Sequence, residues 1–271
     1  MAWAANSRPL ASAISPSATI EPIDNDTRED TGDDRGRAGA HTNPGSSTSV
    51  PAGTVTGLAV GALVHSGLME IRHDQGTPSV DPDAYVAPTA VLSGHVRVGP
   101  GSCVLHGAVL SADGGAVEVG ANCVIMEHAV LRGTPHHPLT IGDHVLAGPH
   151  SYLTGCTVGD EVFIATGAMV FNGAQMGRAS SVALGGAVHI GCVVPPQTRI
   201  PIGWVAVGDP ARLHPPGEAG KIRAGLEEAG GFLPFVFGAD PAADRGEQMR
   251  SAMRRYAHFL TRSHNGDEPI R

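Results

Sequence analysis

TIGDHVLAGPHSYLTGCTVGDEVFIATGAMV, residues 140–170, has an aliphatic residue at about every sixth position: Ile141, Ala147, Leu153, Val158, Ile164 and Val170. The same spacing continues through residues 98–182, and a Gly or another small residue usually follows the aliphatic one. A six-residue period fits neither a helix nor an ordinary amphipathic strand. A coil with three short strands per turn explains it, because each strand then points one aliphatic side chain inward. The sequence therefore predicts a parallel β-helix.

Two steps in this series are longer than six residues, from Leu110 to Val119 and from Leu131 to Ile141. The extra residues predict two loops that bulge from the coil, SADGGAVE at 111–118 and RGTPHHPLT at 132–140. The segments GPGS, GANC, GDHV and GDEV supply turns between strands.

The repeat also suggests how the chain is divided. Residues 1–68 are predicted to be a disordered or non-native extension, because their first part is rich in Ser, Pro, Gly and Asp and because Met69 opens a phrase that resembles a natural start. Residues 69–212 form the predicted β-helix domain, which ends in a proline-rich edge rung. Residues 213–271 are predicted to be a helical segment and tail, with helices near 218–226 and 246–261 packed along the coil.

Charge and composition exclude several classes of partner. A formal net charge of −8 provides no basic face for DNA or RNA. The apolar stretch at 55–69 is too short and too interrupted to span a membrane, and no basic residues precede it as in a secretory signal. The four cysteines form no close-spaced pair, which favours buried thiols in a reducing compartment. We therefore expect a cytoplasmic protein that binds neither nucleic acid nor membrane.

Three phrases resemble the γ-class carbonic anhydrase family: DAYVAPTAVLSGHVRVGPGSCVLHGAVLSAD at 83–113, the stretch quoted above, and GDPAR at 208–212. The resemblance covers roughly residues 80–212. It implies a left-handed β-helix that assembles as a homotrimer and binds zinc between subunits through three histidines, two from one chain and one from its neighbour.

The resemblance fails at that family's zinc site. The positions of the three histidines are occupied by Arg132, Pro149 and Thr154. Asp113 keeps the carboxylate of an arginine–aspartate pair, while Ser111 stands where the arginine would be. A catalytic zinc ion needs about three nitrogen, sulfur or carboxylate ligands and an open position, so no metal is expected here.

Arg132 places a fixed cation where the family has a dication. We expect it to bind a carboxylate-bearing ligand between subunits, with Ser111 and Thr154 as further substrate-binding residues. The alternative is a surface or interfacial salt bridge.

Two histidines should lie one above the other. The steps of the repeat add up to 22 residues per turn in this region, so His128 is predicted to stack on His150, beside Glu127. With Asp113 these residues are the candidates for acid–base catalysis. They could also be exposed or hydrogen-bonded to turns. His136 and His137 are predicted to lie in a mobile surface loop.

The leading hypothesis is a γ-carbonic-anhydrase-like trimer with a degenerate zinc site that does not hydrate CO2 and that acts on a small anionic substrate between subunits. No cofactor is expected in this case. One alternative is a carbonic anhydrase or other lyase with a rewired metal site that includes His128 and His150 as zinc ligands. Others are a hexapeptide-repeat acyltransferase and a trimeric scaffold without catalytic activity.

Overall fold

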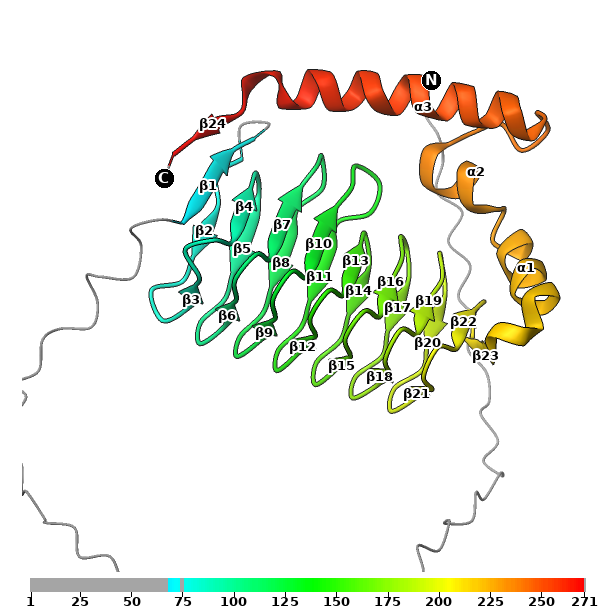
Figure 1. Ribbon diagram of the computed structural model, residues 1–271, viewed down its shortest axis with the longest axis horizontal. Coiled ribbons are helices and arrows are strands. Elements are labelled where there is room, and N and C mark those ends of the chain that lie inside the picture. The colour runs from blue at the N-terminus through cyan, green and yellow to red at the C-terminus, as the bar shows by residue number, and fades with distance from the viewer. Residues whose placement is uncertain (1–67, 74–75, 271) are drawn as a thin grey trace, which may run out of the picture. The chain divides into compact units, whose positions relative to one another are not determined.

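The computed structural model describes residues 68–73 and 76–270. The predicted extension over residues 1–68 lies outside the described residues, apart from Leu68. The described residues form a left-handed parallel β-helix with a helical C-terminal segment, as predicted (Figure 1).

Three sheets form the sides of the coil. Sheet 1 contains β1 (Met69–Arg72), β4 (Val91–Ser93), β7 (Val109–Ala112), β10 (Val130–Gly133), β13 (Tyr152–Thr154), β16 (Met169–Val170), β19 (Ala187–Val188), β22 (Val205–Val207), β23 (Arg212–His214) and β24 (Glu268–Pro269). Sheet 2 contains β2 (Ser79–Val80), β5 (Val96–Val98), β8 (Val117–Val119), β11 (Leu139–Ile141), β14 (Thr157–Val158), β17 (Gln175–Met176) and β20 (Val193–Val194). Sheet 3 contains β3 (Tyr85–Val86), β6 (Cys103–Val104), β9 (Val124–Ile125), β12 (Leu146–Ala147), β15 (Phe163–Ile164), β18 (Ser181–Val182) and β21 (Arg199–Ile200).

The aliphatic repeat forms the core. Leu110, Leu131 and Leu153 lie on adjacent strands of sheet 1, in register and fully buried. Small and aliphatic side chains of successive turns stack on one another, so the interior is a continuous column made mainly of Val, Leu, Ile and Ala. The two predicted loops leave the coil between β7 and β8 and between β10 and β11.

The C-terminal segment leaves the last turn through β23, which pairs antiparallel with β22. It continues as η2 (Pro216–Glu218), α1 (Ala219–Glu228), α2 (Phe232–Phe237), α3 (Arg245–Ser263) and η3 (His264–Gly266). The helix α3 runs along the coil above sheet 1, and β24 then pairs antiparallel with β1 (Figure 1). The two helices expected from the sequence correspond to α1 and α3, whereas α2, β23 and β24 were not predicted.

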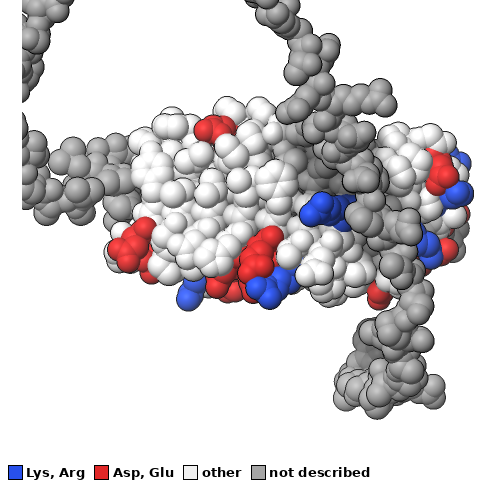
Figure 2. All heavy atoms as spheres, turned by 90° about the horizontal axis from the view of Figure 1, so that it is seen from below, with Lys and Arg blue, Asp and Glu red and all other residues white. Residues whose placement is uncertain are grey.

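The outer faces of the three sheets differ. Sheet 1 is covered by the C-terminal segment. Sheet 2 exposes polar side chains, namely Arg97, Glu118, Thr140, Thr157 and Gln175. Sheet 3 presents mainly apolar ones, namely Tyr85, Val124, Leu146 and Phe163. From the side opposite α3, a broad area without charged residues lies beside an edge where they gather (Figure 2).

Among residues 68–73 and 76–270, no helix combines the length and the apolar character that a membrane crossing requires.

Candidate functional site

The site begins with three residues that lie side by side on sheet 1. Ser111 in β7, Arg132 in β10 and Thr154 in β13 are paired in register, one turn above another. Asp113 directly follows β7 and is almost fully buried. The structure therefore brings together all three predicted substrate-binding residues and one predicted acid–base residue.

Asp113 and Arg132 form an ion pair, and the Ser111 hydroxyl donates a hydrogen bond of 2.6 Å to Asp113 Oδ1. Burial alone would lower the pKa of the Arg132 guanidinium, but the Asp113 carboxylate outweighs this and holds the pKa above its usual value. Because position 111 is a serine, β7 provides no arginine for Asp113. Arg132 in β10, on the next turn of the coil, provides the guanidinium instead. Arg132 is therefore not an isolated cation.

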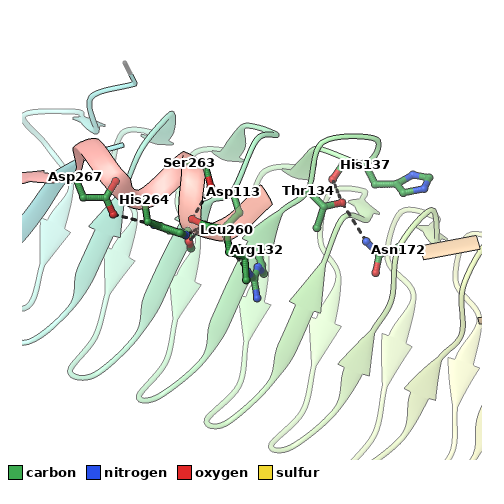
Figure 3. Close-up of polar contacts among 10 residues, drawn as sticks. Asp113, Arg132, Thr134, His137, Asn172, Leu260, Ser263, His264 and Asp267 are labelled. Atoms are coloured by element: carbon green, nitrogen blue, oxygen red, sulfur yellow. Dashed lines mark hydrogen bonds and ion pairs between the residues drawn. The ribbon is translucent and has the colours of Figure 1, made fainter. Parts of the chain in front are cut away.

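The helix α3 closes this site from above (Figure 3). The Tyr256 ring faces Arg132, with its centroid 5.9 Å from the guanidinium carbon. His264 Nε2 lies 3.8 Å from Asp113 Oδ1. Sequence reasoning missed both residues, because no spacing within the repeat relates them to the coil.

A cavity of about 570 Å³ lies between sheet 1 and the helices α2 and α3. Asp113, Arg132 and Thr154 line its polar part. Aromatic residues are only 4% of the chain, yet five of the six Phe and two of the three Tyr line this cavity: Phe171, Phe232, Phe235, Phe237, Phe259, Tyr152 and Tyr256. The lining of the cavity is therefore largely aromatic, and Asp113, Arg132 and Thr154 are among its polar residues.

A second guanidinium, that of Arg255, belongs to the lining and donates hydrogen bonds to the carbonyls of Phe237 and Gly238 at 3.1 and 2.9 Å. The lining thus combines two arginines with one carboxylate, Asp113. Its formal charge is positive, which favours a negatively charged group on a ligand.

The loop after β10 packs against α2. His137 stacks on Phe235 with ring centroids 5.3 Å apart, and burial lowers the pKa of His137, with a smaller contribution from His136. Asn172 donates a hydrogen bond of 3.1 Å to the Thr134 hydroxyl (Figure 3). His136 is exposed, in line with the predicted surface loop, whereas His137 is half-buried against α2. The predicted mobility of the loop stays a prediction.

The predicted stacking of His128 on His150 is confirmed, with ring centroids 5.1 Å apart and planes 11° from parallel. Both residues have left-handed backbone angles at a corner of the coil. Gly107 lies beneath them, where a Cβ atom would come within 2.4 Å of His128 Nδ1. Neither histidine lines the cavity, and Glu127 does not either. Their roles as acid–base groups or metal ligands stay predictions.

The chain is similar to plant carbonic anhydrases. The mitochondrial γ-carbonic anhydrase 1 of Arabidopsis thaliana is 38% identical over 142 residues, which are 50% of each chain. The β-helix domain is γ-carbonic-anhydrase-like. Mitochondrial γ-carbonic anhydrase 2 of the same plant is 34% identical over 143 residues, 51% of this chain and 49% of the relative. This γ-carbonic-anhydrase-like chain spans about half the length of these relatives.

Other similarities are weaker. The carnitine operon protein CaiE of Escherichia coli K12 is 32% identical over 106 residues. These residues are 39% of this chain and 54% of the relative. Among solved structures, the UDP-N-acetylglucosamine acyltransferase of Francisella novicida is 14% identical, with 75% of this chain and 90% of that one covered and a TM-score of 0.44. No protein-family model matches the chain.

The residues at the three positions implied for zinc do not fit a zinc ion in this γ-carbonic-anhydrase-like fold. Arg132 is a cation held by Asp113, Thr154 offers only a hydroxyl, and Pro149 has no side-chain donor atom. Zinc in proteins takes sulfur, imidazole nitrogen or carboxylate oxygen ligands.

Proposed function

We propose that this γ-carbonic-anhydrase-like protein binds a small organic anion with an apolar body in the cavity between sheet 1 and the helices α2 and α3. We further propose that the protein is a homotrimer. Its inherited zinc position is proposed to bind no metal, so the protein would not hydrate CO2 there. The proposal rests on one observation: the Asp113–Arg132 pair lines a cavity in which most of the aromatic residues of the chain gather.

The size and charge of the cavity support this ligand class. Its volume of about 570 Å³ falls within the range of roughly 300–1,000 Å³ typical of small-molecule sites. Asp113 fixes the orientation of the Arg132 guanidinium, which still has donors not used by that ion pair. A carboxylate accepts hydrogen bonds from such a planar fork more strongly than a neutral group does. An aromatic or aliphatic body would replace water against the Phe and Tyr side chains.

The outer face of sheet 3 supports assembly. A shallow apolar groove there is lined by Phe163, Leu184 and Ile202, which are half or more exposed, together with Met126 and Pro149. Exposed apolar surface of this kind marks contact sites between proteins. Met126 and Pro149 are near neighbours in sequence of His128 and His150, so a second copy docked on this groove would approach the histidine pair. Glu127, His128 and His150 would then serve as acid–base groups near a neighbouring subunit.

The Arg132→Lys variant is expected to weaken carboxylate binding about tenfold to a hundredfold, because lysine keeps the charge but loses the planar fork. The probes are 4-phenylbutyrate and its neutral amide, measured by isothermal titration calorimetry on the full chain. Arg178→Lys, in an exposed ion pair with Glu161, is the matched control and should bind like the parent. If the parent binds neither probe, or does not distinguish the acid from the amide, this ligand assignment is wrong.

Zinc-supplemented protein is expected to show no zinc-dependent CO2 hydration in a stopped-flow assay near neutral pH, since the residues at the implied ligand positions cannot bind the ion that generates hydroxide. The stacked pair of His128 and His150 gives the rewired-site alternative a specific test. Zinc-dependent hydration that disappears in His128→Ala and in His150→Ala would establish that alternative and contradict the proposal.

A further inference from the structure

Three side chains of the kinds that bind metal ions meet at the first turn of the coil, next to the cavity, since His264 also lies 3.8 Å from Asp113. His73 directly follows β1, His264 begins η3, and Asp267 directly follows η3. Ligand atoms of the three residues all lie within 4.8 Å of one another. We propose that this cluster binds a divalent transition-metal ion, zinc in the first place, which fastens the C-terminal segment to the start of the β-helix.

The ligand set suits zinc. Two imidazoles and one carboxylate, with a water molecule as the fourth ligand, are a set that holds zinc in catalytic sites. The His73 Nδ1 to Asp267 Oδ1 distance is 2.6 Å, and the His264 Nδ1 to Asp267 Oδ2 distance is 2.8 Å. Two ligands of a tetrahedral zinc ion lie about 3.3 Å apart, so the cluster would have to open only slightly.

The side chains of His73 and His264 differ in how freely they can rotate. His73 is buried and fixed in the first turn of the coil, while the His264 side chain is 38% exposed and its ring stacks on His73 with centroids 4.3 Å apart. The exposed ring can turn out of the stack toward an ion that His73 and Asp267 hold. The open side also gives water access to the fourth position.

The ring of His73 is buried, and only one of its two nitrogens has a partner in the described part of the chain. Its Nε2 atom is inaccessible to solvent and has no hydrogen-bond partner among the described residues. Its Nδ1 atom is the one that lies beside Asp267, so an ion in this cluster would be bound through Nδ1 and would leave Nε2 unpaired. The proposal therefore rests on the geometry of the three side chains and on the burial of the His73 ring.

A metal ion would reinforce a weak attachment. The strand β24 pairs with β1 over only two residues, Ile71 with Pro269 and Arg72 with Glu268. The Arg72–Glu268 ion pair is exposed, and such pairs contribute little to stability. An ion held from both ends of the described chain would close a long loop and hold η3 over the first turns of the coil.

The test uses the full chain stripped with EDTA and titrated with Zn²⁺ by calorimetry, with bound zinc counted by elemental analysis and Co²⁺ absorption used to report ligand geometry. We expect one Zn²⁺ per chain. His264→Ala and Asp267→Asn should weaken binding more than about a hundredfold, since even residues that only support the ligands contribute 10–100-fold. Both changes are at exposed or half-buried side chains, and circular dichroism of the metal-free variants will confirm that they fold.

The matched controls are His214→Ala, which removes a histidine paired with Glu218 at the opposite end of the coil, and His128→Ala with His150→Ala. All three should bind zinc like the parent. Failure of the parent to bind stoichiometric zinc would overturn the proposal, and so would undiminished binding by His264→Ala. Binding lost in His128→Ala but retained in His264→Ala would also overturn it and would place the ion at the histidine pair instead.

Discussion

Replacing Asp113 with Ala is expected to lower the free energy of unfolding by about 2–3 kcal/mol. Removing one partner of a buried ion pair leaves the other charge uncompensated and typically costs 3–5 kcal/mol. The lower value is expected here because 27% of the Arg132 side chain is exposed to solvent, whereas only 5% of the Asp113 side chain is. Urea unfolding followed by circular dichroism measures the difference.

The matched control is Glu161→Ala, which breaks the exposed Arg178–Glu161 pair and should cost less than about 1 kcal/mol. A second variant, Asp113→Leu with Arg132→Met, removes both charges and should recover most of the lost stability, because an apolar pair avoids the desolvation penalty. It should still fail to bind 4-phenylbutyrate. Equal losses for Asp113→Ala and Glu161→Ala would mean that the pair at the cavity is no stronger than a surface contact.

The Phe163→Glu variant is expected to convert the proposed trimer into monomers. Phe163 is 50% exposed on sheet 3, so the isolated chain should tolerate glutamate there, whereas an assembly would bury three new carboxylates in an apolar interface. Sedimentation velocity at micromolar concentration measures the change. The control is Gln175→Glu, which adds the same charge to the exposed face of sheet 2 and should leave the assembly intact.

Either of two outcomes would contradict the assignment of the interface to sheet 3. The parent protein could sediment as a monomer, or Phe163→Glu could remain a trimer. A trimer that is lost in Gln175→Glu but not in Phe163→Glu would assign the contact to sheet 2.

Much of the coil follows from the positions of its aliphatic residues. Leu110, Leu131 and Leu153 each had to point inward, because a shift of one residue would move the side chain to the outer face. This requirement set the register of the strands, and the register set the stacking of His128 on His150. The same arithmetic could have revealed the Asp113–Arg132 pair, since Arg132 lies one turn above Ser111 and Asp113 is only two residues further along.

The helical segment illustrates the limit of this reasoning. The helical spacing of Met249, Met253, Tyr256 and Leu260 predicted that α3 packs along the coil, but not on which of the three sheets. That choice depends on the path of the chain through α1 and α2 after the repeat has ended. The α2 sequence FLPFVF, residues 232–237, was too short to carry a helical period, and it supplies three aromatic side chains to the cavity.

The sequence by itself therefore determined the parallel β-helix and the register of its strands, because a local repeat dictates which residues face inward and which stack. The left-handed twist and the replacement of the zinc ligands were expected from the family resemblance alone. Only the tertiary structure decided that Tyr256 covers Arg132, that the aromatic residues gather around one cavity, and that His73 meets His264 and Asp267. These contacts join residues that lie outside the repeat or on opposite ends of the described chain. No period relates them, and their meeting depends on how the C-terminal segment folds back over sheet 1 to bury its apolar surface.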